Sequence, residues 1–168
     1  MKRIIMIATA LMPLLLMAQA RIGIVNSQQL FDLMPEKAAA EAQLKTLSDR
    51  YHTEYELLQL EFDKKYADYQ TVAADPSTPE AIKERRVQEL QESDKKMREF
   101  ERRAADDIAA QRTVLTQPIT DRIQAAIRTA GEQGALDIVL DTAVTPVAYA
   151  GASTIDITPI VKAILGIK

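Results

Sequence analysis

Residues 36–74 contain neither glycine nor proline, and this feature constrains the fold more than any other in the sequence. The stretch is rich in alanine, glutamate, leucine and lysine, which favour helix, so we predict one continuous helix. At about 1.5 Å per residue it would span roughly 55 Å, whereas an average globular helix has only about a dozen residues. The length indicates an extended helical architecture.

Apolar side chains recur at regular steps along this predicted helix. They are Leu44, Leu47, Tyr51, Tyr55, Leu58, Phe62, Tyr66 and Tyr69. The steps of three, four and four residues make an eleven-residue repeat, close to 3.67 residues per turn. This period predicts a nearly straight or slightly right-handed pairing with another helix.

Residues 75–79, with the sequence DPSTP, interrupt the helical pattern. Two prolines and a Ser-Thr pair predict a turn, and Pro79 suits the first position of a second long helix that runs to about Ala130. A short turn folds two long helices back antiparallel, so the numbers of paired residues should sum to about 154. Leu58 would then face Met97.

The second predicted helix has a less regular apolar face. Its apolar positions include Ile82, Val87, Leu90, Met97, Phe100, Ala104, Ile108, Leu115, Ile119, Ile123 and Ile127. Asp94 takes a place where an apolar residue would fit. The pairing face of this helix is therefore expected to be more polar than that of the first.

The two ends of the mature chain predict short strands and helices. We expect strands at residues 22–25, 136–141, 145–150 and 154–157, with a short turn joining 136–141 to 145–150. Asn26 and Gln29 form a capping-box pattern for a short helix, and Thr158-Pro159 caps a last one.

The fold class that follows is α+β, mostly α. A long antiparallel helical hairpin, the arm (residues 36–117, tip at 75–79), is expected to project from a small β-rich body formed by residues 21–35 and 118–168. The body has a thin core, and a small sheet with exposed edges is prone to pair with another chain. We therefore expect a homo-oligomer held together through the body.

Residues 1–20 have the pattern of a cleavable signal peptide. Lys2 and Arg3 precede an apolar run over residues 4–17, and Ala18-Gln19-Ala20 supplies a small-x-small cleavage site. The run is shorter than the roughly twenty residues of a membrane span, so an uncleaved anchor is the less favoured alternative. We expect a soluble exported protein that begins at Arg21.

The chain lacks the residues of common catalytic and metal sites. It has no cysteine and one histidine, His52, so no zinc site of the usual kind can form. Motifs for a nucleophilic serine, a phosphate loop or a dinucleotide fold are absent. The net charge of −3 becomes more negative once Lys2 and Arg3 are removed, which argues against a general nucleic-acid binder. We expect no catalysis, no metal and no cofactor.

The scarce aromatic residues concentrate in the arm. With Met97, they give the predicted contact residues Tyr51, Tyr55, Phe62, Tyr66, Tyr69, Met97 and Phe100. Two interpretations stay open. The aromatic stripe can be simply the face that joins the two helices, with solvated ion pairs on its rims. Alternatively, part of each ring stays exposed and holds non-native chains weakly in many orientations.

The terminal segments resemble the Skp/OmpH family of periplasmic chaperones. The resemblance lies in IGIVNSQQLFDLMPE at 22–36, ALDIVLD at 135–141 and VAYAGASTIDITPIVKAIL at 147–165, with long polar helices between. It implies a jellyfish-like trimer whose arms enclose a cavity and hold unfolded outer-membrane β-barrel proteins without ATP before membrane insertion. It places Ile24, Val25, Ile138, Val139, Val147 and Tyr149 in the strands of the trimer body.

The chain departs from the best-known relatives in its charge. Those proteins are strongly basic, whereas this chain is acidic, so lipopolysaccharide binding and charge steering of clients are not carried over. Membrane contact is expected to be at most peripheral. The alternative function is a periplasmic adaptor or structural protein that docks a fixed envelope partner through the hairpin tip, near Thr78, Glu80 and Ile82.

Overall fold

The computed structural model describes residues 20–167, which form two compact units. The sheet unit combines the chain up to Asp32 with the chain from Arg122 onward, and the hairpin unit is Leu33–Asp121. The predicted signal peptide lies outside the described residues except for Ala20. Within the described chain, no helix has both the length and the hydropathy needed to cross a membrane. The α+β, mostly helical fold class is confirmed.

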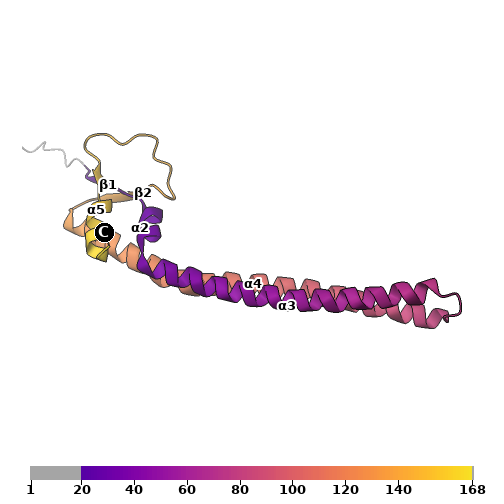
Figure 1. Ribbon diagram of the computed structural model, residues 1–168. Coiled ribbons are helices and arrows are strands. Elements are labelled where there is room, and N and C mark those ends of the chain that lie inside the picture. Colours follow the sequence, from indigo (N-terminus) through magenta and orange to yellow (C-terminus); the bar gives the residue numbers. More distant parts are fainter. Residues whose placement is uncertain (1–19, 168) are drawn as a thin grey trace, which may run out of the picture. The chain divides into compact units, whose positions relative to one another are not determined.

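Two long helices dominate the chain and run side by side (Figure 1). Helix α3 (Pro35–Ala74) carries its proline in the first turn, where a missing N–H leaves no helical hydrogen bond unmade. Helix α4 (Glu80–Gln133) continues through Pro118 as a single helix. The absence of glycine from most of this length explains why neither helix ends early.

The turn between α3 and α4 is organised by Asp75. Its carboxylate accepts hydrogen bonds from the Ser77 N–H and hydroxyl at 2.9 and 2.7 Å and from the Thr78 hydroxyl at 3.1 Å. These bonds, first of all that from the Ser77 hydroxyl, lower the pKa of Asp75. The Pro79 carbonyl then accepts from Ile82 N at 3.0 Å and begins α4. Pro76 and Pro79 interrupt the helix, and the hydrogen bonds of the Asp75 side chain then stabilise the turn that reverses the chain direction.

Contacts across the hairpin establish its register. The Tyr51 hydroxyl donates to Asp107 Oδ2 at 2.8 Å, and Lys65 Nζ donates to Ser93 Oγ at 2.7 Å. The residue numbers in both pairs sum to 158, against the expected value of about 154. The antiparallel pairing is confirmed, and its register differs from the expected one by about one helical turn.

The sheet has three parallel strands in the order β2-β1-β3. Strand β1 (Ile22–Val25) lies in the centre, between β2 (Ile138–Asp141) and β3 (Ile155–Asp156). Gly23 pairs with Val139 on one side and with Ile155 on the other. The strands come from both ends of the chain, as predicted, but no two of them are joined by a hairpin turn.

The predicted strand at residues 145–150 is wrong. The Asp141 carbonyl accepts hydrogen bonds from Val144 N and Thr145 N, and its carboxylate accepts one from Ala143 N, so the chain turns sharply after β2. Pro146 has no backbone N–H to donate to a neighbouring strand, and both edges of β1 are already paired with β2 and β3. Val147 and Tyr149, which we had placed in strands of the body, lie in this irregular segment.

Two short helices complete the sheet unit. Helix α2 (Ser27–Leu33) begins with Gln29 N donating to Asn26 Oδ1 at 2.9 Å, which is the predicted N-cap. Helix α5 (Thr158–Leu165) ends at Gly166, whose φ of 72° suits glycine. Thr158 does not cap α5 as predicted, because it is the first residue of the helix and Ile157 takes the N-cap position. The Thr158 N–H donates to the Asp156 carboxylate at 2.9 Å.

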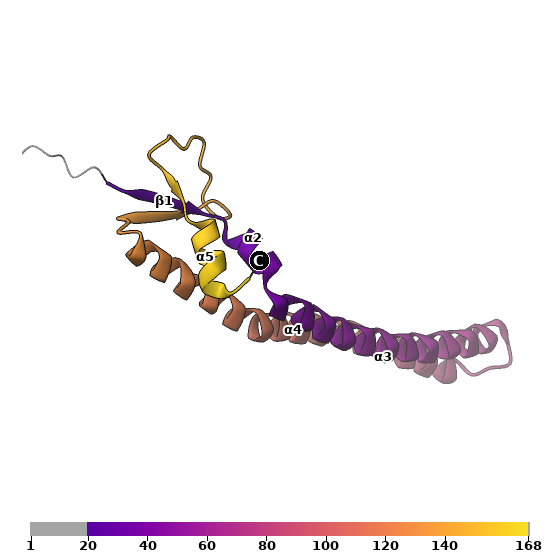
Figure 2. The ribbon, with the colours of Figure 1, turned by 60° about the vertical axis from the view of Figure 1, so that its left-hand side comes forward.

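The core of the sheet unit brings together residues far apart in the sequence. Its most completely buried large side chains are Val25, Leu30, Ile157 and Val161. The last turns of α4 contribute Ile123, Ala126 and Ala130, also buried. In Figure 2, α5 and the end of α4 lie on the same side of the sheet. Small alanines on α4 allow the close approach that this thin core requires.

Candidate functional site

The structure brings most of the predicted contact residues into the interface between α3 and α4. Half-buried positions are taken by Tyr51, Tyr55, Phe62, Tyr69, Met97 and Phe100. Tyr66 alone among the seven is exposed, with 46% of its surface accessible. The aromatic stripe is therefore mainly the interface that joins the helices, with Tyr66 at its outer rim.

Tyr51 and Tyr55 connect the two helices through both their rings and their hydroxyls. The Tyr51 ring meets Phe100 edge to face at 5.8 Å between centroids, while its hydroxyl donates to Asp107. The Tyr55 hydroxyl is hydrogen-bonded to Glu101. Such rings are packed on one side and wet at the polar tip, so they stabilise the hairpin and still reach its surface.

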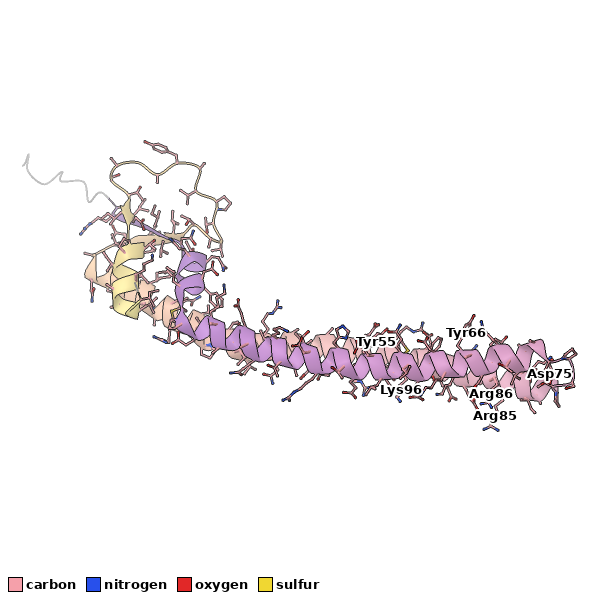
Figure 3. All side chains as sticks on the ribbon, in the orientation of Figure 1. Tyr55, Tyr66, Asp75, Arg85, Arg86 and Lys96 are labelled. Atoms are coloured by element: carbon pink, nitrogen blue, oxygen red, sulfur yellow. The ribbon has the colours of Figure 1, made fainter. Side chains whose placement is uncertain are left out.

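Phe62 and Tyr66 extend the aromatic surface from the interface outward. Their rings are stacked with centroids 6.4 Å apart and an interplanar angle of 7°. Figure 3 places Tyr55 and Tyr66 toward one edge of the hairpin and Lys96, Arg85 and Arg86 toward the other. In this view the exposed ring of Tyr66 therefore lies on the opposite edge of the hairpin from Arg85, Arg86 and Lys96.

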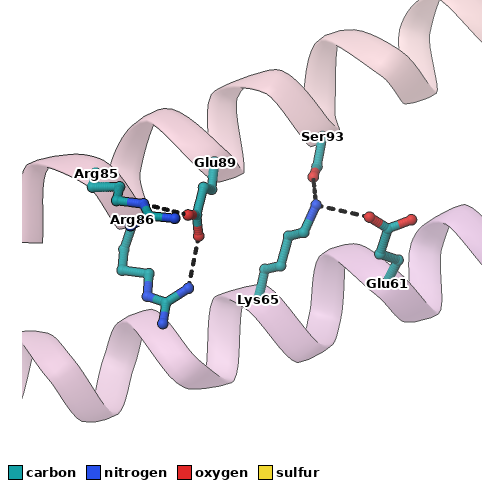
Figure 4. Close-up of polar contacts among 6 residues, drawn as sticks. All are labelled: Glu61, Lys65, Arg85, Arg86, Glu89 and Ser93. Atoms are coloured by element: carbon teal, nitrogen blue, oxygen red, sulfur yellow. Dashed lines mark hydrogen bonds and ion pairs between the residues drawn. The ribbon is translucent and has the colours of Figure 1, made fainter. Parts of the chain in front are cut away.

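The predicted eleven-residue repeat fails after Phe62. The next half-buried residue is Lys65 rather than Tyr66, and Tyr69 follows, so the steps become three and four residues. Lys65 Nζ donates to Ser93 Oγ at 2.7 Å and to Glu61 Oε1 at 2.8 Å (Figure 4). Its aliphatic stem can lie in the interface because these acceptors satisfy the ammonium.

Ser93, not Asp94, occupies the interface position opposite Lys65, and it is only 7% exposed. Replacing Ser93 by alanine should therefore lower the free energy of unfolding by about 1 kcal/mol, because the Lys65 ammonium loses an acceptor. Urea unfolding followed by circular dichroism measures the change. The exposed Ser48→Ala on α3 is the matched control and should not destabilise. Equal effects of the two substitutions would contradict a role for the Lys65–Ser93 contact.

Tyr51 should titrate at unusually high pH. The hydrogen bond to Asp107 is the largest cause that raises the pKa of Tyr51 above 10.0, followed by burial and by the charges of Asp107 and Glu54. A raised folded-state pKa adds stability that is fully present below pH 10.0 and is lost as the pH rises through the folded-state value. Ultraviolet titration should show the ionisation of Tyr51 moving back toward 10.0 in Asp107→Asn. An unchanged curve would exclude the hydrogen bond in solution.

The hairpin exposes large apolar side chains that the spacing argument missed. They are Leu57 at 63%, Leu60 at 52%, Ile82 at 44% and Val114 at 64% exposure. Ile82 had been assigned to the interface, where Lys83 is instead half-buried. Leu57, Leu60 and Val114 lie outside the three-and-four spacing of the interface. The sequence signal for exposed apolar surface is therefore a large apolar residue at a position that does not face the partner helix.

The charged rims of the hairpin consist largely of pairs three or four residues apart. Arg86 lowers the pKa of Glu89 most strongly, with help from Arg85, and both are drawn in Figure 4. Lys65 likewise lowers the pKa of Glu61. Exposed pairs of this kind add little stability. Across residues 20–167, no group of three or more histidine, aspartate or glutamate side chains is arranged to hold a metal ion.

The predicted oligomer residues of the sheet unit differ in exposure. Val25 is buried, and Ile24, Val139 and Val147 are half-buried. Ile138 at 51% and Tyr149 at 85% are exposed. In the described chain, β2 and β3 each pair on one side only. Exposed apolar side chains beside unpaired strand edges are typical of surfaces that another chain covers.

Comparison with known proteins identifies one family and one fold. The sequence matches the family described as outer membrane protein (OmpH-like) over residues 21–165. A solved structure described as an OmpH-like outer membrane chaperone from Caulobacter crescentus CB15 has a TM-score of 0.66 and 17% identity, covering 88% of this chain and 85% of that one. This likeness shows a shared fold. Among curated proteins, none matches the sequence significantly.

Proposed function

Since the chain belongs to the OmpH-like family of outer membrane proteins, we propose that it is an ATP-independent periplasmic holdase. It binds unfolded outer-membrane β-barrel precursors and prevents their aggregation before membrane insertion. The family match over residues 21–165 and the chaperone with the same fold support this function. The OmpH-like family is not an enzyme family, and we assign the chain no catalytic step and no cofactor.

The observation that carries the proposal is the exposed apolar surface of the hairpin. Two paired helices can bury only the faces that meet, and here Leu57, Leu60, Tyr66 and Val114 are each 46% exposed or more. Exposed apolar surface on a soluble protein is typical of an interaction site. Separate weak contacts along one hairpin suit an unfolded chain, because many of them act together at high effective concentration.

Assembly through the sheet unit would bring several hairpins around one client. We assign Ile24, Val25, Ile138, Val139, Val147 and Tyr149 to a homo-oligomer interface, most simply a trimer whose arms enclose a cavity. The unpaired edges of β2 and β3 in the described chain, and the exposure of Ile138 and Tyr149, support this assignment. Export through the signal peptide pattern at residues 1–20 would deliver the protein to the periplasm.

The mass of the mature protein in solution tests the proposed function. Native mass spectrometry without nucleotide should give a trimer, and addition of a urea-diluted β-barrel outer membrane protein should give a trimer with one client. A control with the same β-barrel already folded in detergent should give no complex, because its apolar surface is covered. A monomer that is indifferent to the unfolded client would contradict the proposal.

A further inference from the structure

The outer face of α3 around Leu57 and Leu60 points to a particular kind of client segment, and this inference rests on the proposed holdase function. We infer that this face, the leucine patch (Thr53–Lys64), binds client segments that combine apolar residues with lysine or arginine. The preference for such segments comes from two water-exposed leucines that have carboxylates near them on the same helix.

The two leucines form one surface because they lie three residues apart on a helix. Leu57 is 63% and Leu60 is 52% exposed, although Leu58 between them is half-buried in the helix interface. A shallow groove on α3 adjoins Leu57. It is lined by Thr46, Asp49, Arg50, Thr53, Glu54 and Leu57. Leucine and threonine side chains at this groove offer apolar contact to an extended chain without any rearrangement of the hairpin.

The charge around the leucine patch is negative. Residues 49–64, which include the groove, contain five carboxylates against one arginine, Arg50, and one lysine. Glu54 and Asp63 have no cationic partner among the described residues, so their charges remain available. Glu54 precedes Leu57 by one helical turn, and Asp63 follows Leu60 by one turn. Each leucine therefore has an unpaired carboxylate on its own face of the helix.

Charge complementarity selects the occupant. The aliphatic stem of a lysine or arginine can lie on a leucine while its charged head reaches a carboxylate one turn away. A segment rich in glutamate or aspartate would bring like charges together, which costs free energy. An unfolded client offers both kinds of segment, so the leucine patch should retain the basic ones.

A second copy of the hairpin is a poorer occupant. Four basic residues of α4 are already paired within that helix: Arg85 and Arg86 with Glu89, Lys95 with Glu99, and Arg98 with Asp94. Docking these residues on the leucine patch would exchange one exposed ion pair for another, so it would gain little free energy. An unfolded chain has no such pairs to break, and its extended backbone can follow the groove.

Fluorescence anisotropy with the mature protein and two labelled peptides tests the inference. Both peptides alternate leucine with a charged residue, which is lysine in one and glutamate in the other. The lysine peptide should bind about tenfold more tightly at low salt, since two or three exposed charge pairs contribute roughly 0.2–1 kcal/mol each. This preference should shrink as salt is added, because the charges are exposed.

Three variants locate the preference on the leucine patch. Glu54→Gln with Asp63→Asn should bring the two peptides to within about twofold of each other. Leu57→Ser with Leu60→Ser should weaken lysine-peptide binding by about tenfold, through lost apolar contact. The matched control, Glu92→Gln with Asp106→Asn, removes two exposed carboxylates from α4 and should leave the preference unchanged.

Several outcomes would overturn the inference. Equal binding of both peptides by the parent protein would remove the charge preference. Retention of the preference in Glu54→Gln with Asp63→Asn would move it elsewhere on the chain. A lower native mass of the Leu57→Ser, Leu60→Ser variant would show that a second copy covers the patch. Each of these results leaves the proposed holdase function standing if the parent protein still suppresses aggregation of an unfolded β-barrel protein. If the parent protein does not suppress that aggregation, the holdase function itself is refuted.

Discussion

Replacing Ile157 by alanine should lower the free energy of unfolding of the sheet unit by about 3 kcal/mol. Ile157 has no exposed surface, and it is among the few large side chains so completely buried. It lies between β3 and α5, and its N–H donates to the Ile24 carbonyl at 2.9 Å. Truncation leaves a cavity where strand and helix meet, and a core this thin has few neighbouring side chains to fill it.

Hydrogen exchange of the β1 amides gives the free energy of opening of the sheet unit. It therefore measures the effect of Ile157→Ala on the sheet unit without a contribution from the hairpin. Ile155→Ala is the matched control, because Ile155 lies two residues earlier in β3 and is 36% exposed. It should cost less than about 1 kcal/mol. If the two substitutions cost the same, the core of the sheet unit is not where the structure places it.

Removing exposed apolar side chains from the hairpin should reduce its capacity to hold clients. We expect the combined variant Tyr66→Ser, Ile82→Ser and Val114→Ser to need at least about tenfold more protein to suppress aggregation of a urea-diluted β-barrel protein. The three side chains are 44–64% exposed, so their loss removes client contact without opening the helix interface. Light scattering at a series of protein concentrations measures the effect.

The matched control for this variant replaces exposed polar residues of the same hairpin. Gln59→Ser with Gln70→Ser lowers helix propensity at least as much as the apolar-to-serine changes do, and it removes no large apolar side chain. Its suppression curve should overlay that of the parent protein. Circular dichroism should show the same helix content in the parent and both variants. Unchanged suppression by the apolar-to-serine variant would mean that the hairpin surface does not hold the client.

The hairpin could be predicted because its signals are local. A long stretch free of glycine and proline, a proline-rich turn and a three-and-four apolar spacing each act within a few residues. Pro35 begins α3 through its fixed φ, whereas Asn26 and Asp75 fix element ends through hydrogen bonds to near neighbours. Pairing of α3 with α4 follows from the shortness of the turn.

The segment at 145–150 could not be predicted in the same way. Its branched and aromatic residues favour a strand, but a strand also needs a partner edge, and that depends on long-range pairing. In the structure, β1 is already paired on both sides and Asp141 turns the chain away from the sheet. Likewise, the apolar pattern favoured Tyr66 for the interface, whereas the hydrogen bond between Lys65 and Ser93 brings Lys65 there instead.

The candidate site was predicted in kind but not in detail. The sequence indicated that apolar surface on the hairpin could contact clients, and it directed attention to the aromatic stripe. That stripe is regular because it pairs the helices, and the same regularity leaves most of it half-buried. Leu57, Leu60 and Val114 are exposed because they lie outside the pattern. On a helical hairpin, apolar residues that break the interface spacing are therefore the better indicator of exposed apolar surface.

Site-specific photocrosslinking tests the central claim most directly. A photoreactive phenylalanine analogue is placed at position 66 or 114 on the hairpin, or at position 160 on the exposed side of α5, and the protein is mixed with an unfolded β-barrel client. The account predicts strong client adducts from the two hairpin positions and weak ones from position 160. Adducts from position 160 alone, or equal adducts from all three positions, would contradict it.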